Sequence, residues 1–123
     1  MSGNATGKKR KDFLASYARI KDPGSAGTIR PVNDGEISLI TTAAAEDRTM
    51  EAAASYPYGF RHTVILNSDG GDCTLDSCVN AAGGAGDVVL DDEGDWVLLE
   101  IGVSAADTKA WRIIASDGCT VPS

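Results

Sequence analysis

Alternating apolar and polar residues recur along the chain in short runs, and turn-forming residues separate these runs. The clearest run covers residues 60–66, where Phe60, His62, Val64 and Leu66 take every second position. A period of two is typical of β-strands that turn one face to a core. Further strands are predicted at residues 28–32, 37–42, 73–79, 88–90, 95–101 and 109–115.

Turn signals recur at roughly 8–12 residues, which is typical of an all-β fold. The fold class predicted is a small antiparallel β-sandwich or barrel, β-tulip or jelly-roll-like, with an extended N-terminal arm. Pro31 restricts the strand at 28–32 to a sheet edge. Residues 87–121 are interpreted as a β-meander of three strands.

The strand at 95–101 is apolar on both faces. Trp96 and Leu98 share one face, and Val97 and Leu99 share the other. A strand with this pattern is buried on both sides. We expect one face to meet the core and the other to meet a second layer or a neighbouring subunit.

Residues 42–55 fit two structures. Their many alanines favour a helix by propensity, but alanine gives a helix no strong apolar face for docking. Pro57 ends the helix or strand that precedes it. Helix and strand both stay open here, and we favour a strand or loop.

Charge divides the chain into an arm and a body. Residues 1–30 hold seven Lys and Arg against two Asp, whereas residues 31–123 hold four against sixteen Asp and Glu. We therefore expect a basic arm at 1–27 and an acidic all-β body at 28–123, which should repel nucleic acid. The arm could touch an acidic protein surface or a phosphate backbone, or could have no partner.

The three cysteines are expected to be reduced thiols, because their number is odd and no apolar segment follows the basic N-terminal residues as in an export signal. Cys73 and Cys78 are five residues apart, so in one continuous strand they would point to opposite faces. No apolar run approaches the roughly 20 residues of a membrane span.

Candidate chemistry is sparse. His62 is the single histidine, and no local motif supplies it with a nucleophile and an orienting acid, so a structural role is favoured. The acidic turns at 69–72 and 91–95 lack EF-hand spacing, and Asp-Gly turns explain them without calcium. Trp96 and Trp111 could form a glycan platform, but a core or interface role is favoured. We expect no catalytic, cofactor or metal site.

Several segments occur together in an order that resembles a known family. These segments are 48–50, 63–66, 69–75, 91–99 and 109–118. Over residues 46–121 the pattern resembles small β-rich virion proteins of tailed bacteriophages, including capsid decoration (cement) proteins and β-domains of tail and head fibres. The resemblance favours a strand around 48–50, although Met50 stands where leucine is more usual.

The resemblance implies a non-enzymatic structural protein, often a homotrimer, made in the host cytoplasm and seated on the capsid surface of the virion. Its partners would be the major capsid protein and further copies of itself. The alternative is a receptor- or glycan-binding module of a tail or head fibre. The implied capsid-binding arm comprises Lys8, Lys9, Arg10, Lys11, Phe13, Leu14, Tyr17 and Arg19. The implied core and intersubunit contacts are Trp96, Val97, Leu99, Trp111 and Ile113.

Overall fold

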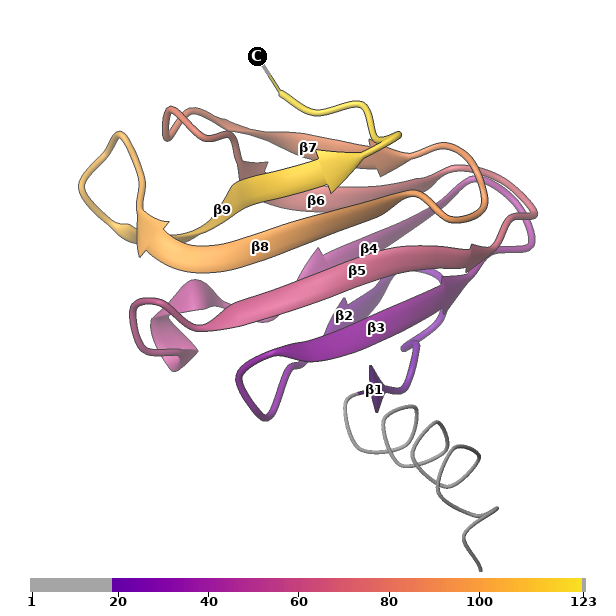
Figure 1. Cartoon of the computed structure of the whole chain (residues 1–123), viewed down its shortest axis with the longest axis horizontal. Coiled ribbons are helices and arrows are strands. Elements are labelled where there is room, and N and C mark those ends of the chain that lie inside the picture. Colours follow the sequence, from indigo (N-terminus) through magenta and orange to yellow (C-terminus); the bar gives the residue numbers. More distant parts are fainter. Residues whose placement is uncertain (1–18, 123) are drawn as a thin grey trace, which may run out of the picture.

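The computed structural model describes residues 19–122, and this part of the chain is all-β (Figure 1). Its elements are β1 (Arg19–Ile20), β2 (Gly27–Ile29), β3 (Glu36–Thr41), β4 (Glu46–Met50), the 3-10 turn η1 (Ala53–Ser55), β5 (Arg61–Ser68), β6 (Cys73–Val79), β7 (Ala85–Leu90), β8 (Trp96–Val103) and β9 (Lys109–Asp117). Within this range no helix is long and apolar enough to cross a membrane.

The strands form one curled sheet whose two halves face each other across the core. The order along the sheet is β1-β3-β5-β8-β9-β6-β4-β2, and β7 pairs with β6. We call β1, β3, β5, β8 and β9 the front half, and β2, β4, β6 and β7 the back half (Figure 1). The pairing of Val79 in β6 with Arg112 in β9 joins the halves, and a bridge between Val89 and Thr120, which follows β9, adds a second link. The predicted small all-β sandwich or barrel is therefore confirmed.

The pairing is more parallel than predicted. From β1 to β6 each strand lies in the opposite half from the one before it, so neighbours within a half run the same way. The pairs β1–β3, β3–β5, β2–β4 and β4–β6 are all parallel. The expectation of an antiparallel fold is thus wrong for these four pairs, whereas β5 with β8 and β6 with β7 are antiparallel as expected. Alternation along the chain does not reveal which strands become neighbours.

The predicted meander at residues 87–121 is also wrong in part. β8 and β9 form an antiparallel hairpin, but β7 pairs with β6 rather than with β8. The turn at 91–95 therefore carries the chain from the back half to the front half. Asp95 stabilises this turn, since its Oδ2 accepts hydrogen bonds from the amides of Asp91 (3.0 Å) and Asp92 (2.8 Å).

The core follows the predicted alternation. In β5, His62, Val64 and Leu66 are buried, and in β8 Val97 and Leu99 are buried. Residues 42–55 contain a strand, β4, followed by the short turn η1, so the strand interpretation of this segment is confirmed. A tilted aromatic cluster packs beside η1 and consists of Tyr56, Phe60 and Trp111.

A β-bulge in β6 changes where the cysteines point. Ser77 has φ +66°, and the pairing register with β7 shifts between Leu75 and Cys78. The bulge turns Cys78 inward, so Cys73 and Cys78 are both fully buried instead of lying on opposite faces. Both are free thiols, and burial raises the pKa of Cys73 to about 11 and that of Cys78 to about 12.

The body begins earlier than predicted. β1 pairs with β3, and Asp22 is bound by the buried Arg48, so residues 19–27 belong to the body and not to an arm that ends at residue 27. The residues that follow β1 include no large apolar side chain, and this is why the sequence pattern placed them in the arm.

Candidate binding surface

The front half turns an apolar surface away from the core. The strand register aligns Leu39, Ile65 and Trp96 in one row across β3, β5 and β8. A second row aligns Ile37, Thr63 and Leu98 in the same way. All six side chains alternate with the buried positions of their strands and are half-buried. We call the five apolar members the outer face: Ile37, Leu39, Ile65, Trp96 and Leu98.

The corresponding surface of the back half is polar. Asp47, Thr74 and Val89 are aligned across β4, β6 and β7, and Thr49 is aligned with Asp76. Burial raises the pKa of the Asp76 carboxyl, and the nearby charges of Asp47 and Asp87 add to this effect. Only the front half among the described strands thus presents a row of large apolar side chains to the outside.

A charged row borders the outer face. Arg61, Glu100 and Arg112 are aligned across β5, β8 and β9, and Arg61 Nε donates to Glu100 Oε2 at 2.7 Å. Arg61 is half exposed, so this pair contributes at most about 1 kcal/mol to stability. The Arg112 side chain lies over Gly102, where an added Cβ would stand 3.0 Å from its Cδ.

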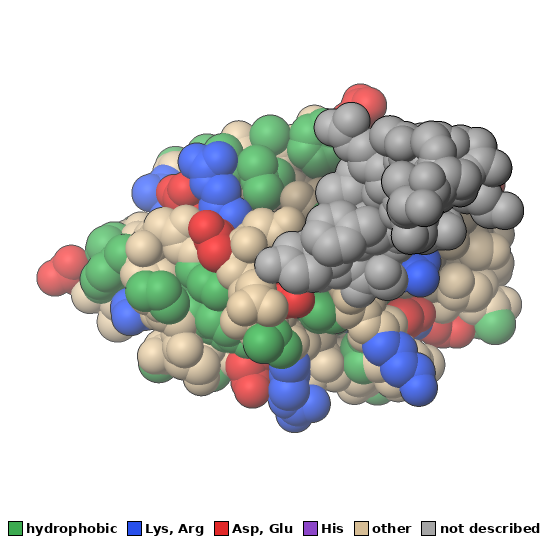
Figure 2. Space-filling view, turned by 60° about the horizontal axis from the view of Figure 1, so that its bottom comes forward, with side chains coloured by type: hydrophobic (Ala, Val, Ile, Leu, Met, Phe, Trp, Pro, Cys, Tyr) green, Lys and Arg blue, Asp and Glu red, His purple; other side chains and the backbone are tan. Residues whose placement is uncertain are grey.

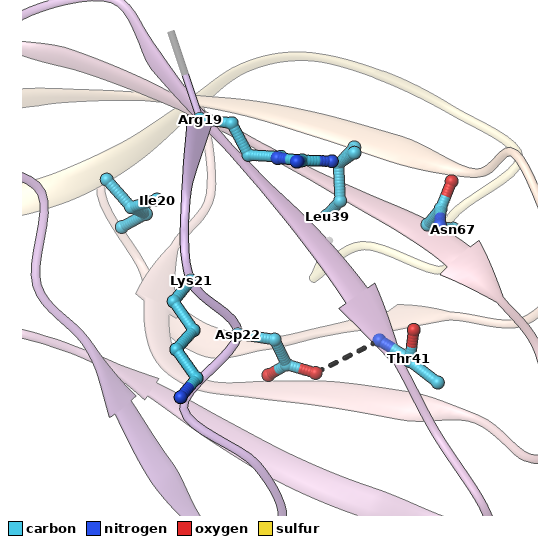
Figure 3. A pocket seen from close by; sticks show the side chains of 7 residues that line it. All are labelled: Arg19, Ile20, Lys21, Asp22, Leu39, Thr41 and Asn67. Carbon is cyan, nitrogen blue, oxygen red and sulfur yellow. Dashed lines mark hydrogen bonds between the residues drawn. The ribbon is translucent and has the colours of Figure 1, made fainter. Parts of the chain in front are cut away.

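An open pocket of about 500 Å³ lies at the β1 end of the outer face. We call it the β1 pocket. Figure 3 shows Arg19 lying over Leu39 towards Asn67, and Asp22 facing Thr41. Figure 2, which brings the lower side of Figure 1 forward, shows hydrophobic side chains interspersed with charged ones on the surface drawn in colour. The lining residues are Arg19, Ile20, Lys21, Asp22, Leu39, Thr41 and Asn67.

A buried arginine holds the wall of the β1 pocket in place. Arg48 is fully buried, and its Nε and Nη2 donate to the two oxygens of Asp22 at 2.8 and 3.1 Å. Its remaining donors reach Glu46 Oε1 and the carbonyls of Asp47 and Thr41, so all five N–H groups of the guanidinium have acceptors. Asp22 and Glu46 thereby share the positive charge of Arg48.

The charge of Asp22 is well stabilised. Burial alone would raise its pKa, but the hydrogen bonds from Arg48 and from the amides of Thr41 and Gly24 outweigh burial and lower the pKa. Asp22 therefore stays ionised and bound to Arg48 across the physiological pH range.

His62 lies in the core beside Ser38. Its Nε2 is 2.8 Å from Ser38 Oγ, both residues are fully buried, and Nδ1 has no hydrogen-bond partner among the described residues. The carboxylate of the nearby Glu36 is hydrogen-bonded elsewhere, because its Oε1 accepts from the amides of Val32 and Asn33. The serine–histidine pair therefore lies in an enclosed position and not in a cleft that a substrate could enter.

The predicted site residues fall in three places. Val97, Leu99, Trp111 and Ile113 lie in the core, whereas Trp96 is half-buried on the outer face. The burial of Trp111 removes one of the two rings of the glycan platform considered above. Arg19 lies in the β1 pocket. The other predicted arm residues lie outside the described range: Lys8, Lys9, Arg10, Lys11, Phe13, Leu14 and Tyr17.

The sequence interpretation missed most of the outer face. Ile37, Leu39 and Ile65 lie on the outward faces of strands whose alternate residues are buried. Apolar residues on both faces of a strand are the sequence signal for such a surface, and the sequence interpretation applied this signal to β8 alone. No protein-family model and no curated protein matches the sequence.

Proposed function

We propose that this protein is a non-enzymatic structural protein that assembles on a larger protein surface, as a capsid decoration protein on the head of a tailed bacteriophage. The observation that carries the proposal is the outer face. A contiguous, half-buried apolar surface on the outer side of a sheet favours an interaction site. Its aromatic member, Trp96 at the β8 end of the first row, is of the residue type typical of the anchors that dominate interface energies.

The outer face serves contacts between copies or with the capsid. Its two rows span three strands, and the charged row of Arg61, Glu100 and Arg112 gives it the polar rim usual for interfaces. We favour a homotrimer on the capsid surface, with the major capsid protein as partner. The basic residues of the N-terminal segment, Lys8 to Lys11, would meet acidic positions of that partner.

Cryo-electron microscopy of undecorated heads, with and without the purified protein, tests the proposal. Added density at regular positions on the capsid is expected. A variant that lacks residues 1–18 keeps β1 intact and should bind the heads more weakly. Heads that acquire no density at saturating protein would refute the proposal.

Light scattering of matched variants tests the outer face separately. Leu98→Lys places a charge on the outer face, and Thr74→Lys places the same charge on the polar surface of the back half. Burying one leucine contributes roughly 1.5–3 kcal/mol, so Leu98→Lys should weaken self-association by at least about tenfold. Thr74→Lys should leave it unchanged. Equal oligomer masses for both variants would exclude the outer face as the contact between copies.

A further inference from the structure

We propose that the β1 pocket binds a short, extended acidic segment of a protein partner, with an aliphatic side chain beside the carboxylate. This inference rests on the proposed function in taking the ligand to be a protein segment. It adds a specific site and the chemistry that this site recognises.

The first step is charge. Arg19 and Lys21 are exposed, line the pocket, and form no ion pair with any residue between 19 and 122. The acidic lining residue, Asp22, is bound to Arg48 through two hydrogen bonds, and Arg48 also pairs with Glu46. The lining residues therefore carry a net positive charge, two cations against one ion-paired carboxylate, in a body where acidic residues greatly outnumber basic ones. Anionic groups are the complement of such a site.

The second step is the rest of the lining. Ile20 and Leu39 provide apolar surface, and the exposed Asn67 amide can donate and accept hydrogen bonds. A ligand that fills this pocket must combine a carboxylate with an aliphatic group. Acidic and aliphatic side chains in one peptide segment have this combination, whereas a bare phosphate lacks the apolar part.

The third step is the sheet edge. β1 is two residues long and pairs with Ile37 and Ser38 of β3. On this side β3 has no strand partner from Leu39 onwards among residues 19–122, although Asp22 Oδ2 accepts from the Thr41 amide at 3.0 Å. A partner in extended conformation fits beside such an edge. A long polyanion such as a nucleic acid would also meet the acidic body, which repels it.

Fluorescence polarisation with the full chain tests the proposal. The probe is a labelled peptide of alternating Glu and Leu, and the comparison is the same peptide with Gln in place of Glu. The structure predicts saturable binding of the Glu peptide and much weaker binding of the Gln peptide. Equal binding of both peptides, or binding of neither, would overturn the proposal.

Matched charge variants locate the binding. Arg19→Glu/Lys21→Glu should raise the Kd of the Glu peptide at least about fivefold, since it reverses two contacts. Arg19→Glu alone should raise it at least about twofold, whereas Arg30→Glu makes the same change in net charge at an exposed position outside the pocket and should leave it unchanged. If circular dichroism shows that the double variant is unfolded, Arg19→Gln/Lys21→Gln replaces it. Equal effects of Arg19→Glu and Arg30→Glu would place binding outside the pocket.

Two further outcomes separate this inference from its alternatives. Competition by a thymidine oligonucleotide as effective as that by unlabelled Glu peptide would assign the pocket to phosphate and overturn the peptide proposal. Heads decorated equally by wild type and by Arg19→Glu/Lys21→Glu, with no peptide binding, would refute the pocket but leave the proposed function. Peptide binding without any decoration of heads would refute the proposed function but leave the pocket.

Discussion

Mild acid should destabilise this protein through a single buried side chain. His62 is the one histidine of the chain, and it is fully buried between the two halves of the sheet. Its Nδ1 has no hydrogen-bond partner among the described residues. Burial lowers the pKa of His62 from 6.5 to about 4, against the weaker opposing effect of Glu36. The folded state therefore holds the imidazole neutral where the unfolded chain would protonate it.

The size and sign of the effect follow from linkage. The folded pKa lies below the unfolded one, so the unfolded state binds more protons between about pH 6.5 and pH 4, and stability falls as the pH is lowered through this window. With these two pKa values, the free energy of unfolding should drop by about 2 kcal/mol between pH 7 and pH 5. The pKa of Asp22 is lowered from 3.8, so Asp22 contributes its own loss at lower pH, outside this window.

Urea unfolding at pH 7, 6 and 5, followed by tryptophan fluorescence, measures the effect. The control is Ser38→Ala/His62→Leu, which removes the titrating group and its 2.8 Å partner together and leaves neither of them unpaired. The wild type should lose stability between pH 7 and pH 5, and the control should lose much less. Equal losses in the two proteins would refute the assignment to His62.

Three further predictions concern stability and thiol chemistry. Arg48→Met should lower the free energy of unfolding in urea by about 3 kcal/mol, because it leaves the carboxylates around Arg48 without their partner. Arg30→Met, at an exposed ion pair, should lower it by less than about 1 kcal/mol. Similar losses in the two variants would contradict a stabilising role for the ion pairs of Arg48. Gly71→Ala should lower the free energy of unfolding by at least about 2 kcal/mol in the same assay, since a Cβ there would collide with backbone atoms of the chain before β4. Gly35 has φ +86° and open space around it, so Gly35→Ala should lower it by about 1 kcal/mol. Native protein should react slowly with Ellman's reagent at pH 8, because burial raises the pKa of Cys119 to about 12, and unfolded protein should show three free thiols; a smaller number would indicate a disulfide.

Local patterning predicted the strands well and their partners poorly. The alternation at residues 60–66 and 95–101 corresponds to β5 and β8, with the expected residues buried. The pairing of β7 with β6, and the parallel neighbours of β3, depend on contacts between distant segments. A run of alternating residues carries no information about such neighbours. The β-bulge at Ser77 could likewise not be predicted, because a single serine in a strand does not indicate a bulge.

The N-terminal boundary was missed for a related reason. Residues 19–27 lack the apolar alternation that marks a strand, and they join the body through the short β1–β3 pairing and the ion pair of Asp22. Asp22 and Arg48 are 26 positions apart, and their contact is formed only when β4 lies next to β2 and across from β3. A buried guanidinium with five acceptors is a property of the folded chain and has no local sequence signal.

The two sides of the sheet show why the outer face calls for a function. If apolar residues at outward positions were needed only to form strands, both halves would carry them. The back half forms its strands with Asp47, Thr49, Thr74 and Asp76 at these positions, and Val89 is the one large apolar residue aligned with them. The rows of the front half are therefore not required by β-structure, and apolar surface on the outside of a sheet favours unwanted association. The chain alternates between the halves from β1 to β6, so these residues are separated in sequence and become one surface only in the fold. A contact that covers the front half and leaves the back half in solvent accounts for this asymmetry.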